Sequence, residues 1–157
     1  MNKRILYTRP DGGVSVVVPA INFDEPAMTE DQAVARALAK SIPADATSAQ
    51  VVDTAVVPTD RTFRNAWEQT GSAIVHNIAK CRTLWRQKMR AHRATRWPLW
   101  DAEYLKADED GNVVRKAQLA AKRQQLRDVT AHPDIDAATT PDALRLAWPA
   151  ILDETPA

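Results

Sequence analysis

The chain has 157 residues, of which 45% are hydrophobic and 26% charged, and its formal net charge is +1. This length and composition indicate one ordinary globular domain, or a small domain with an appendage, and the near-neutral total identifies no class of partner. The single cysteine, Cys81, excludes an intrachain disulfide and a cysteine-based zinc site. The start of the chain lacks the apolar run of a signal peptide, and no segment approaches the roughly 18 apolar residues that span a bilayer. We therefore expect a protein that has no membrane partner and that stays in a cytoplasm unless it leaves inside a larger assembly.

The charges are unevenly distributed along the chain. Residues 61–96 carry nine bases and only Glu68 as an acid, whereas acids outnumber bases in residues 1–60 and 97–157. Seven of these bases lie in one run that contains no acid: Lys80, Arg82, Arg86, Lys88, Arg90, Arg93 and Arg96. A basic middle between acidic ends can be neutralised within the fold, which is the simplest interpretation of the pattern.

The N-terminal part predicts strands and one helix. Two β-prone runs, residues 5–8 and 14–18, flank a Pro-Asp-Gly-Gly turn and predict a hairpin. Residues 20–28 resemble an irregular loop. Thr29 and Gln32 have the spacing of a capping box, so we expect a helix from Thr29 that stops near the Ile42-Pro43 pair.

The next segment predicts short elements. Residues 50–52 and 55–57 are β-prone, and residues 73–76 predict another short strand. Between them, Asp60 is placed to cap a helical turn that would carry Phe63 and Trp67 on one face. Gly71 indicates a turn before the last of these strands.

A long basic helix is predicted to begin after Asn77. Its apolar stripe has spacings of three and four residues, and its members are Ile78, Cys81, Trp85, Met89 and His92. We expect this helix to end by Trp97, because Pro98 disfavours α geometry in the residue before it. A second helix should then begin at Pro98 and carry five carboxylates up to the turn at residues 110–112.

The C-terminal part predicts two further helices. Residues 113–129 are rich in helix formers, with Leu119 and Leu126 a heptad apart. Residues 136–139 predict a loop. Thr140 and Pro141 then have the types expected at the N-cap and first position of a short helix.

The basic helix, residues 78–96, is the main candidate for a functional surface. Its cations can form a solvated face or pair with the carboxylates of the next helix, although exposed pairs are each worth only ~0–1 kcal/mol. They can also contact an acidic protein partner. Alternatively, they can grip phosphates while nearby tryptophans stack on bases, as in a nucleic-acid-binding protein.

Catalytic and metal-binding patterns are missing from the sequence. The three histidines lie on separate predicted elements without the spacing of a helical metal site, and no phosphate-binding glycine motif occurs. Cys81 is expected to be a small core residue, and His92 a packed, hydrogen-bonded one. We therefore predict no enzymatic activity, no cofactor and no metal.

Residues 56–148 resemble small accessory proteins of tailed bacteriophages and prophages, similar to the tail or tail-fibre assembly chaperone-type family. The resemblance is carried by these features: residues 58–67 (PTDRTFRNAW), a basic helix after a short strand, Glu103-Tyr104-Leu105, residues 122–129 (KRQQLRDV), and a TTPxxL segment at residues 139–144. The opening hairpin, which ends in Val-Pro-Ala, is similar too. Residues 94–100 are bulkier than the family's leucine- and alanine-rich version.

The resemblance implies a role in tail or tail-fibre assembly, or as a minor virion component, with no reaction and no cofactor. It implies other tail or fibre proteins as partners, and a location in the virion tail or in the cytoplasm of the infected host. Nucleic-acid binding through residues 78–96 is the alternative.

We expect an α+β fold in three parts: a β-rich part at residues 1–76, an antiparallel helical hairpin or three-helix unit at residues 77–130, and a C-terminal loop, short helix and tail at residues 131–157. The residues expected to contact a partner are Arg86, Arg90, Arg93 and Trp97. Those expected to fix the join between the first two parts are Asp60, Arg64 and Trp67.

Overall fold

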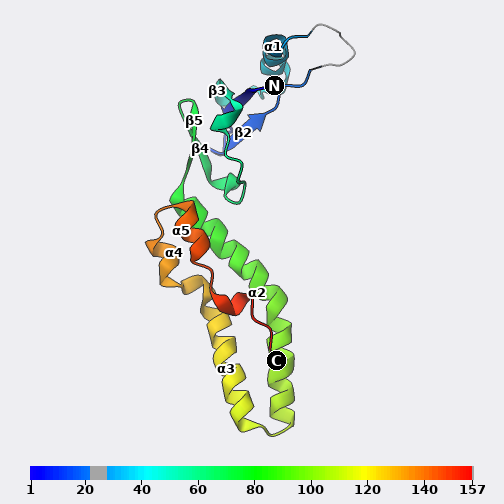
Figure 1. The fold of residues 1–157 in the computed structure, drawn as a ribbon, viewed down its shortest axis with the longest axis vertical. Coiled ribbons are helices and arrows are strands. Elements are labelled where there is room, and N and C mark those ends of the chain that lie inside the picture. Colours follow the sequence, from blue (N-terminus) through cyan, green and yellow to red (C-terminus); the bar gives the residue numbers. More distant parts are fainter. Residues whose placement is uncertain (22–27, 157) are drawn as a thin grey trace. The chain divides into compact units, whose positions relative to one another are not determined.

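The computed structural model describes residues 1–21 and 28–156. Its fold is mixed α+β, with antiparallel strands in the N-terminal part followed by several helices (Figure 1), which confirms the predicted fold class. The chain divides into two compact units, Met1–Asn77 and Ile78–Ala157. Residues 131–157, which the sequence sets apart, lie within the second unit. Most of the loop expected at residues 20–28 lies outside the described residues.

A three-stranded antiparallel sheet organises the first unit. Its strands are β1 (Lys3–Thr8), β2 (Val14–Val17) and β3 (Thr47–Asp53), in the order β2-β1-β3. The predicted β1–β2 hairpin is confirmed, and Gly12 in its turn has a φ of 77°, a conformation that glycine adopts without a Cβ penalty.

The two faces of this sheet are covered differently. Successive strand residues point to opposite faces, so the neighbours Ile5 and Leu6 belong to different clusters. Ile5 packs with Val34 and Ala37 of helix α1 (Glu30–Ser41), and Leu6 packs with Val14, Val52 and Trp67. The predicted capping box of α1, formed by Thr29 and Gln32, is confirmed.

Trp67 begins a strand rather than ending a helix. A 3-10 turn covers only Arg64–Ala66, and Trp67 opens β4 (Trp67–Thr70), which pairs with β5 (Ala73–His76). The prediction of β5 is confirmed, but the helical turn expected to carry Trp67 is wrong. The strand expected at residues 55–57 is also wrong, because Asp53 caps a 3-10 turn at Thr54–Val56.

An antiparallel hairpin of two long helices forms the body of the second unit. Helix α2 spans Ile78–Glu109 and helix α3 spans Val113–Asp128, with Gly111 at a φ of 65° in the turn between them. Helix α3 lies side by side with the second half of α2 in Figure 1, and the two helices are in contact.

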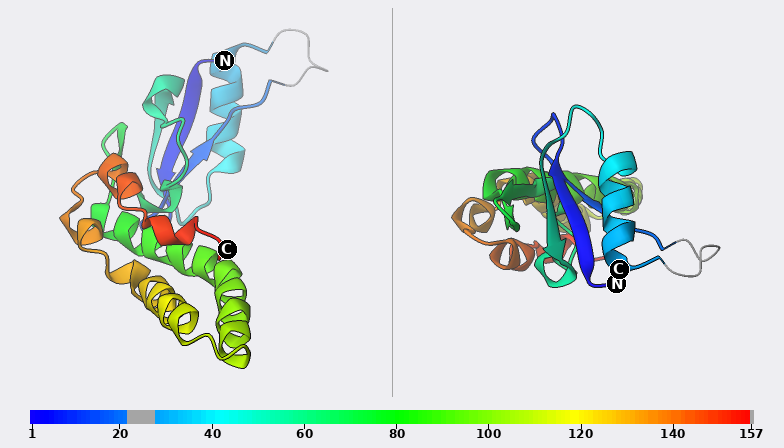
Figure 2. Two further views of the ribbon diagram at one scale, coloured as in Figure 1. Left: turned by 60° about the horizontal axis from the view of Figure 1, so that its bottom comes forward. Right: turned by 90° about the horizontal axis from the view of Figure 1, so that it is seen from above.

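The predicted end of the basic helix at Trp97 is wrong, because α2 continues through Pro98 for eleven more residues, up to Glu109. A proline inside a helix removes one backbone hydrogen bond and crowds the preceding turn. Burial of Trp100 and Ala107 beyond it offsets this cost. The left view of Figure 2 shows α2 bent, and proline is a usual cause of such bends. Four of the five carboxylates expected on a separate antiparallel helix therefore lie on α2 itself, and α3 is its antiparallel neighbour.

The C-terminal segment packs back against the hairpin through short elements. They are the 3-10 turn Val129–Ala131, α4 (Pro133–Ala137), α5 (Pro141–Leu146) and the 3-10 turn Ala150–Leu152. Thr140 caps α5 as predicted, whereas α4 occupies part of the loop expected at residues 136–139. Several of the segment's apolar side chains are buried, among them Ile135, Leu144 and Leu152.

Candidate protein-binding site

One face of α2 is an apolar seam that holds the C-terminal segment. Cys81, Trp85 and Met89 are buried, as the predicted stripe requires. The Nε2 atom of His92 lies 3.0 Å from the carbonyl oxygen of Leu152. Burial raises the pKa of the Cys81 thiol, so the reactive thiolate is disfavoured. Cys81 and His92 therefore have the packed roles that their spacing predicts.

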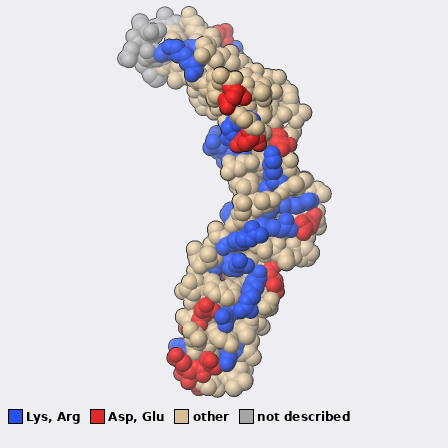
Figure 3. Space-filling model, turned by 180° about the vertical axis from the view of Figure 1, so that it is seen from behind, with Lys and Arg blue, Asp and Glu red and all other residues tan. Residues whose placement is uncertain are grey.

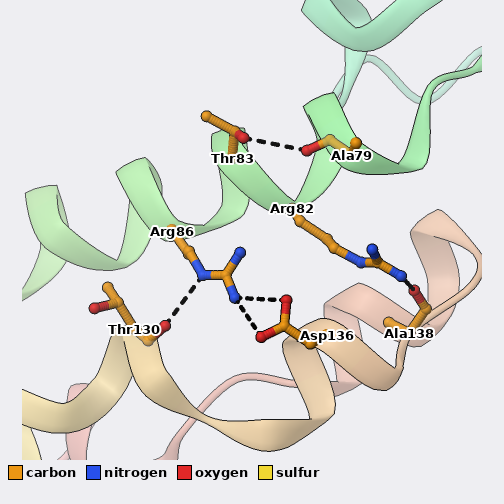
Figure 4. Close-up of polar contacts among 7 residues, drawn as sticks. All are labelled: Ala79, Arg82, Thr83, Arg86, Thr130, Asp136 and Ala138. Atoms are coloured by element: carbon orange, nitrogen blue, oxygen red, sulfur yellow. Dashed lines mark hydrogen bonds and ion pairs between the residues drawn. The ribbon is translucent and has the colours of Figure 1, made fainter.

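Two arginines of the basic helix are used inside the second unit (Figure 4). Arg82 donates from Nη2 to the carbonyl of Ala138 at 2.9 Å. Arg86 donates from Nε to the carbonyl of Thr130 at 3.1 Å, and its Nη2 lies 2.8 Å from both carboxylate oxygens of Asp136. The hydrogen bond from Arg86 lowers the pKa of Asp136. Arg86, predicted to contact a partner, is thus engaged by its own C-terminal segment.

Trp97 lies between two arginines that come from α3. The guanidinium carbons of Arg123 and Arg127 are 5.5 and 5.3 Å from its ring centroid, within the range of cation–π attraction. Arg123 is also 2.7 Å from a carboxylate oxygen of Asp101, and Arg127 donates to Gln124 at 3.1 Å. These contacts hold the ring in place while leaving part of it exposed.

A hollow of about 520 Å³ opens beside this ring. Its lining residues come from one face of α2 and from the end of α3: Arg90, Arg93, Ala94, Trp97, Pro98 and Arg127. The structure therefore brings together three of the four residues predicted to contact a partner. We call this site the arginine–tryptophan hollow.

Three lining residues are not predicted from the sequence: Ala94, Pro98 and Arg127. The sequence places Pro98 at the start of a second helix, so the predicted contact surface ends at Trp97. Arg127 lies in the QLRD segment, but its position beside Trp97 depends on where the turn between α2 and α3 falls. A prediction of α2 at its full length would have placed the end of α3 beside the middle of α2.

The polar groups of the hollow differ in how they are satisfied. Arg93 donates to the carbonyl of Arg127 at 3.0 Å. Arg90 is exposed and makes no hydrogen bond or ion pair with the described residues. Pro98 has no N–H, so the carbonyl of Ala94, four residues earlier, lacks its normal helical donor. The hollow thus combines cationic donors with an aromatic face.

The residues predicted to fix the join all belong to the first unit. The Asp60 carboxylate accepts a hydrogen bond from the backbone N–H of Thr62 at 2.8 Å, and Arg64 is exposed. Trp67 is buried and donates from Nε1 to Nε2 of His76 at 3.1 Å. Their role at the join stays a prediction.

Residues 1–21 and 28–156 contain neither a metal-binding cluster nor a membrane-spanning helix. They contain no group of three or more histidine, cysteine or carboxylate side chains that could hold a metal ion. Among the helices they form, none is both long and apolar enough to cross a membrane. Comparison of the chain with protein-family models, curated proteins and solved structures gave no match. The resemblance to phage tail accessory proteins therefore stays a prediction based on the motifs quoted above.

Proposed function

We propose that this chain is a non-enzymatic phage tail protein that binds another tail or tail-fibre protein, as a minor virion component or as an assembly factor. Its location would be the virion tail or the cytoplasm of the infected host. The resemblance of residues 56–148 supports the biological setting. The arginine–tryptophan hollow supports binding, and it is the observation on which the proposal rests.

Tryptophan and arginine are enriched among the side chains that dominate the energy of protein interfaces. Trp97 is a partly exposed ring held by Arg123 and Arg127, so little side-chain entropy would be lost when a partner packs on it. The exposed Arg90 adds a cation at the rim of the same hollow. A hollow of about 520 Å³ has room for a few side chains of a partner.

Co-purification from phage-producing cells tests this proposal. Tagged wild-type protein should capture a tail or fibre protein, and Trp97→Ala should lose it. Leu105→Ala is the matched control, because Leu105 is an apolar residue of the same helix that is 58% exposed and lies outside the hollow. Equal capture by the wild type and Trp97→Ala would contradict the proposal.

Mass spectrometry of purified particles separates the two forms of the proposal. A virion component would be present at a defined copy number. An assembly factor would be missing from particles but would co-purify with the fibre protein from infected cells. Absence from both preparations would contradict the proposal as a whole.

The alternative is nucleic-acid binding through residues 78–96. Lys and Arg side chains gather over the second unit in Figure 3, while Asp and Glu gather at the hairpin tip, and this distribution favours the alternative. Binding to phosphates releases counterions, so affinity for a single-stranded oligonucleotide should fall steeply with salt. Arg90→Glu should then lower the affinity for the oligonucleotide by removing a phosphate contact. Trp97→Ala should lower it by removing a ring on which a base can stack.

A further inference from the structure

The charge in the arginine–tryptophan hollow is not compensated by its own lining. Three of its six lining residues are arginines, Arg90, Arg93 and Arg127, and none of the six is an acid. Of these three, Arg93 donates a hydrogen bond to the backbone carbonyl of Arg127. Arg127 donates one to the neutral side chain of Gln124. Like charges gathered in a concave, partly desolvated site attract an anion from outside.

Three cations near the hollow have carboxylate partners within the second unit. Arg86 pairs with Asp136, Arg123 with Asp101, and Lys122 with Glu154. The fold thus supplies carboxylates around the hollow but none in it. The planar guanidinium fork of arginine matches a carboxylate in two parallel hydrogen bonds. A carboxylate from another molecule therefore fits the vacant donors of Arg90.

The remaining surface of the hollow fits a peptide. The ring of Trp97 and the side chains of Ala94 and Pro98 offer an apolar wall for an apolar or aromatic side chain. A carboxylate and an apolar side chain occur close together in an acidic peptide segment.

A polynucleotide fits less well because two cations of the basic helix are already engaged within the second unit. Binding along a strand requires cations spaced over several phosphates. Arg82 and Arg86 are directed to Ala138, Thr130 and Asp136. What is left at the hollow is a short cationic site suited to one or two anionic groups.

We infer that the arginine–tryptophan hollow binds an acidic segment of a partner protein, in which a carboxylate contacts Arg90 and a neighbouring apolar or aromatic side chain packs on Trp97. This inference rests on the proposed function, because it names the chemistry of the partner at the same site.

The test uses the full chain and a defined probe. The indole N–H resonance of Trp97 is identified as the one lost in Trp97→Phe, and the protein is titrated with the peptide acetyl-Ser-Glu-Phe-Asp-Ser-amide. The resonance should shift with a saturable dependence on peptide concentration. The matched peptide with Gln and Asn in place of Glu and Asp should bind about tenfold more weakly, the loss expected for one charge-assisted pair.

Two charge reversals on α2 complete the design. Arg90→Glu should weaken binding of the acidic peptide by about tenfold or more, because the carboxylate would meet a like charge. Lys106→Glu should leave binding unchanged, since Lys106 is exposed on the same helix and outside the hollow. The other four tryptophan indoles report whether each variant is folded.

Several outcomes would overturn the inference. The first two are equal affinities for the two peptides and an unchanged Trp97 resonance during the titration. The third is displacement of the acidic peptide by a single-stranded oligonucleotide at a lower concentration than the peptide itself. The fourth is self-association of the chain that prevents the peptide from binding. If the acidic peptide does not bind while Trp97→Ala still loses its partner in co-purification, the proposed function stands. The inference that the partner segment is acidic is then wrong. If the peptide binds while co-purification is unaffected, the proposed function is wrong.

Discussion

Arg86 and Arg90 are one helical turn apart on α2 and have different environments. Arg86 is held by Thr130 and Asp136, and its side chain is 25% exposed. Arg90 is exposed at the rim of the arginine–tryptophan hollow. The sequence identifies both as cations on the same helix face but cannot separate them. The difference arises because the C-terminal segment places Asp136 beside Arg86. This is a tertiary contact between residues that are 50 positions apart in the sequence.

Replacing these two arginines should have different effects on stability. Arg86→Gln removes the charged donor from the Thr130 carbonyl, so we expect a loss of roughly 1 kcal/mol in the unfolding free energy. Arg90→Gln removes no contact among the described residues and should change it by less than about 0.5 kcal/mol. Urea denaturation followed by circular dichroism measures both. Equal losses would contradict the assignment of Arg86 to a structural role.

The contribution of Asp136 should depend on pH. The hydrogen bond from Arg86 holds the pKa of Asp136 below its ordinary value of 3.8. A carboxyl group whose pKa is lowered in the folded state adds stability above its unfolded pKa, and this stability is lost as the pH falls through the folded pKa. The urea midpoint of the wild type should therefore be higher than that of Asp136→Asn. The difference between the two midpoints should be the same at pH 7 and pH 5 and smaller at pH 3. A margin that persists or grows at pH 3 would exclude this coupling.

Helix α2 shows how tertiary packing can override a local signal. Pro98 predicts a helix boundary from local sterics alone, yet the helix continues because its second half buries Trp100 and Ala107. Other elements carry sufficient local signals, such as the Thr29–Gln32 capping box and the Thr140-Pro141 start of α5. Strand β4 has no such signal, because Glu68 and Gln69 become strand residues only by pairing with β5.

Replacing Pro98 tests the origin of the bend in α2. Pro98→Ala restores an N–H for the Ala94 carbonyl and removes the ring clash, so we expect the second unit to gain up to about 3 kcal/mol in unfolding free energy. Chemical denaturation measures this effect. Loss of stability in Pro98→Ala would mean that the packing of α2 requires the bend.

At the scale of the whole molecule, the charge pattern is partly neutralised within the second unit. The acidic C-terminal segment supplies Asp136 to Arg86 and Glu154 to Lys122, as the simplest interpretation of the sequence expects. The arginine–tryptophan hollow is one part of the basic surface that this pairing does not neutralise. Its position could not be derived from the sequence, because it depends on which carboxylates the fold places beside which arginines.

The division into two units predicts that the second unit folds by itself. All lining residues of the hollow, and the residues that hold Trp97 and Arg93, lie in Ile78–Ala157. A fragment of residues 78–157 should therefore keep the Trp97 indole resonance of the full chain. Overlaid ¹H–¹⁵N spectra measure this. A collapsed spectrum of the fragment would show that the second unit requires residues 1–77.

The most direct test of the central claim is site-specific photo-crosslinking in phage-producing cells. A photoreactive amino acid installed in place of Ala94, an exposed residue in the hollow, should crosslink to one tail or fibre protein. The same amino acid in place of Lys106, exposed on the same helix but outside the hollow, should not. Crosslinks from the Ala94 position to nucleic acid, or no crosslink to any protein, would contradict the claim that the hollow binds a protein partner.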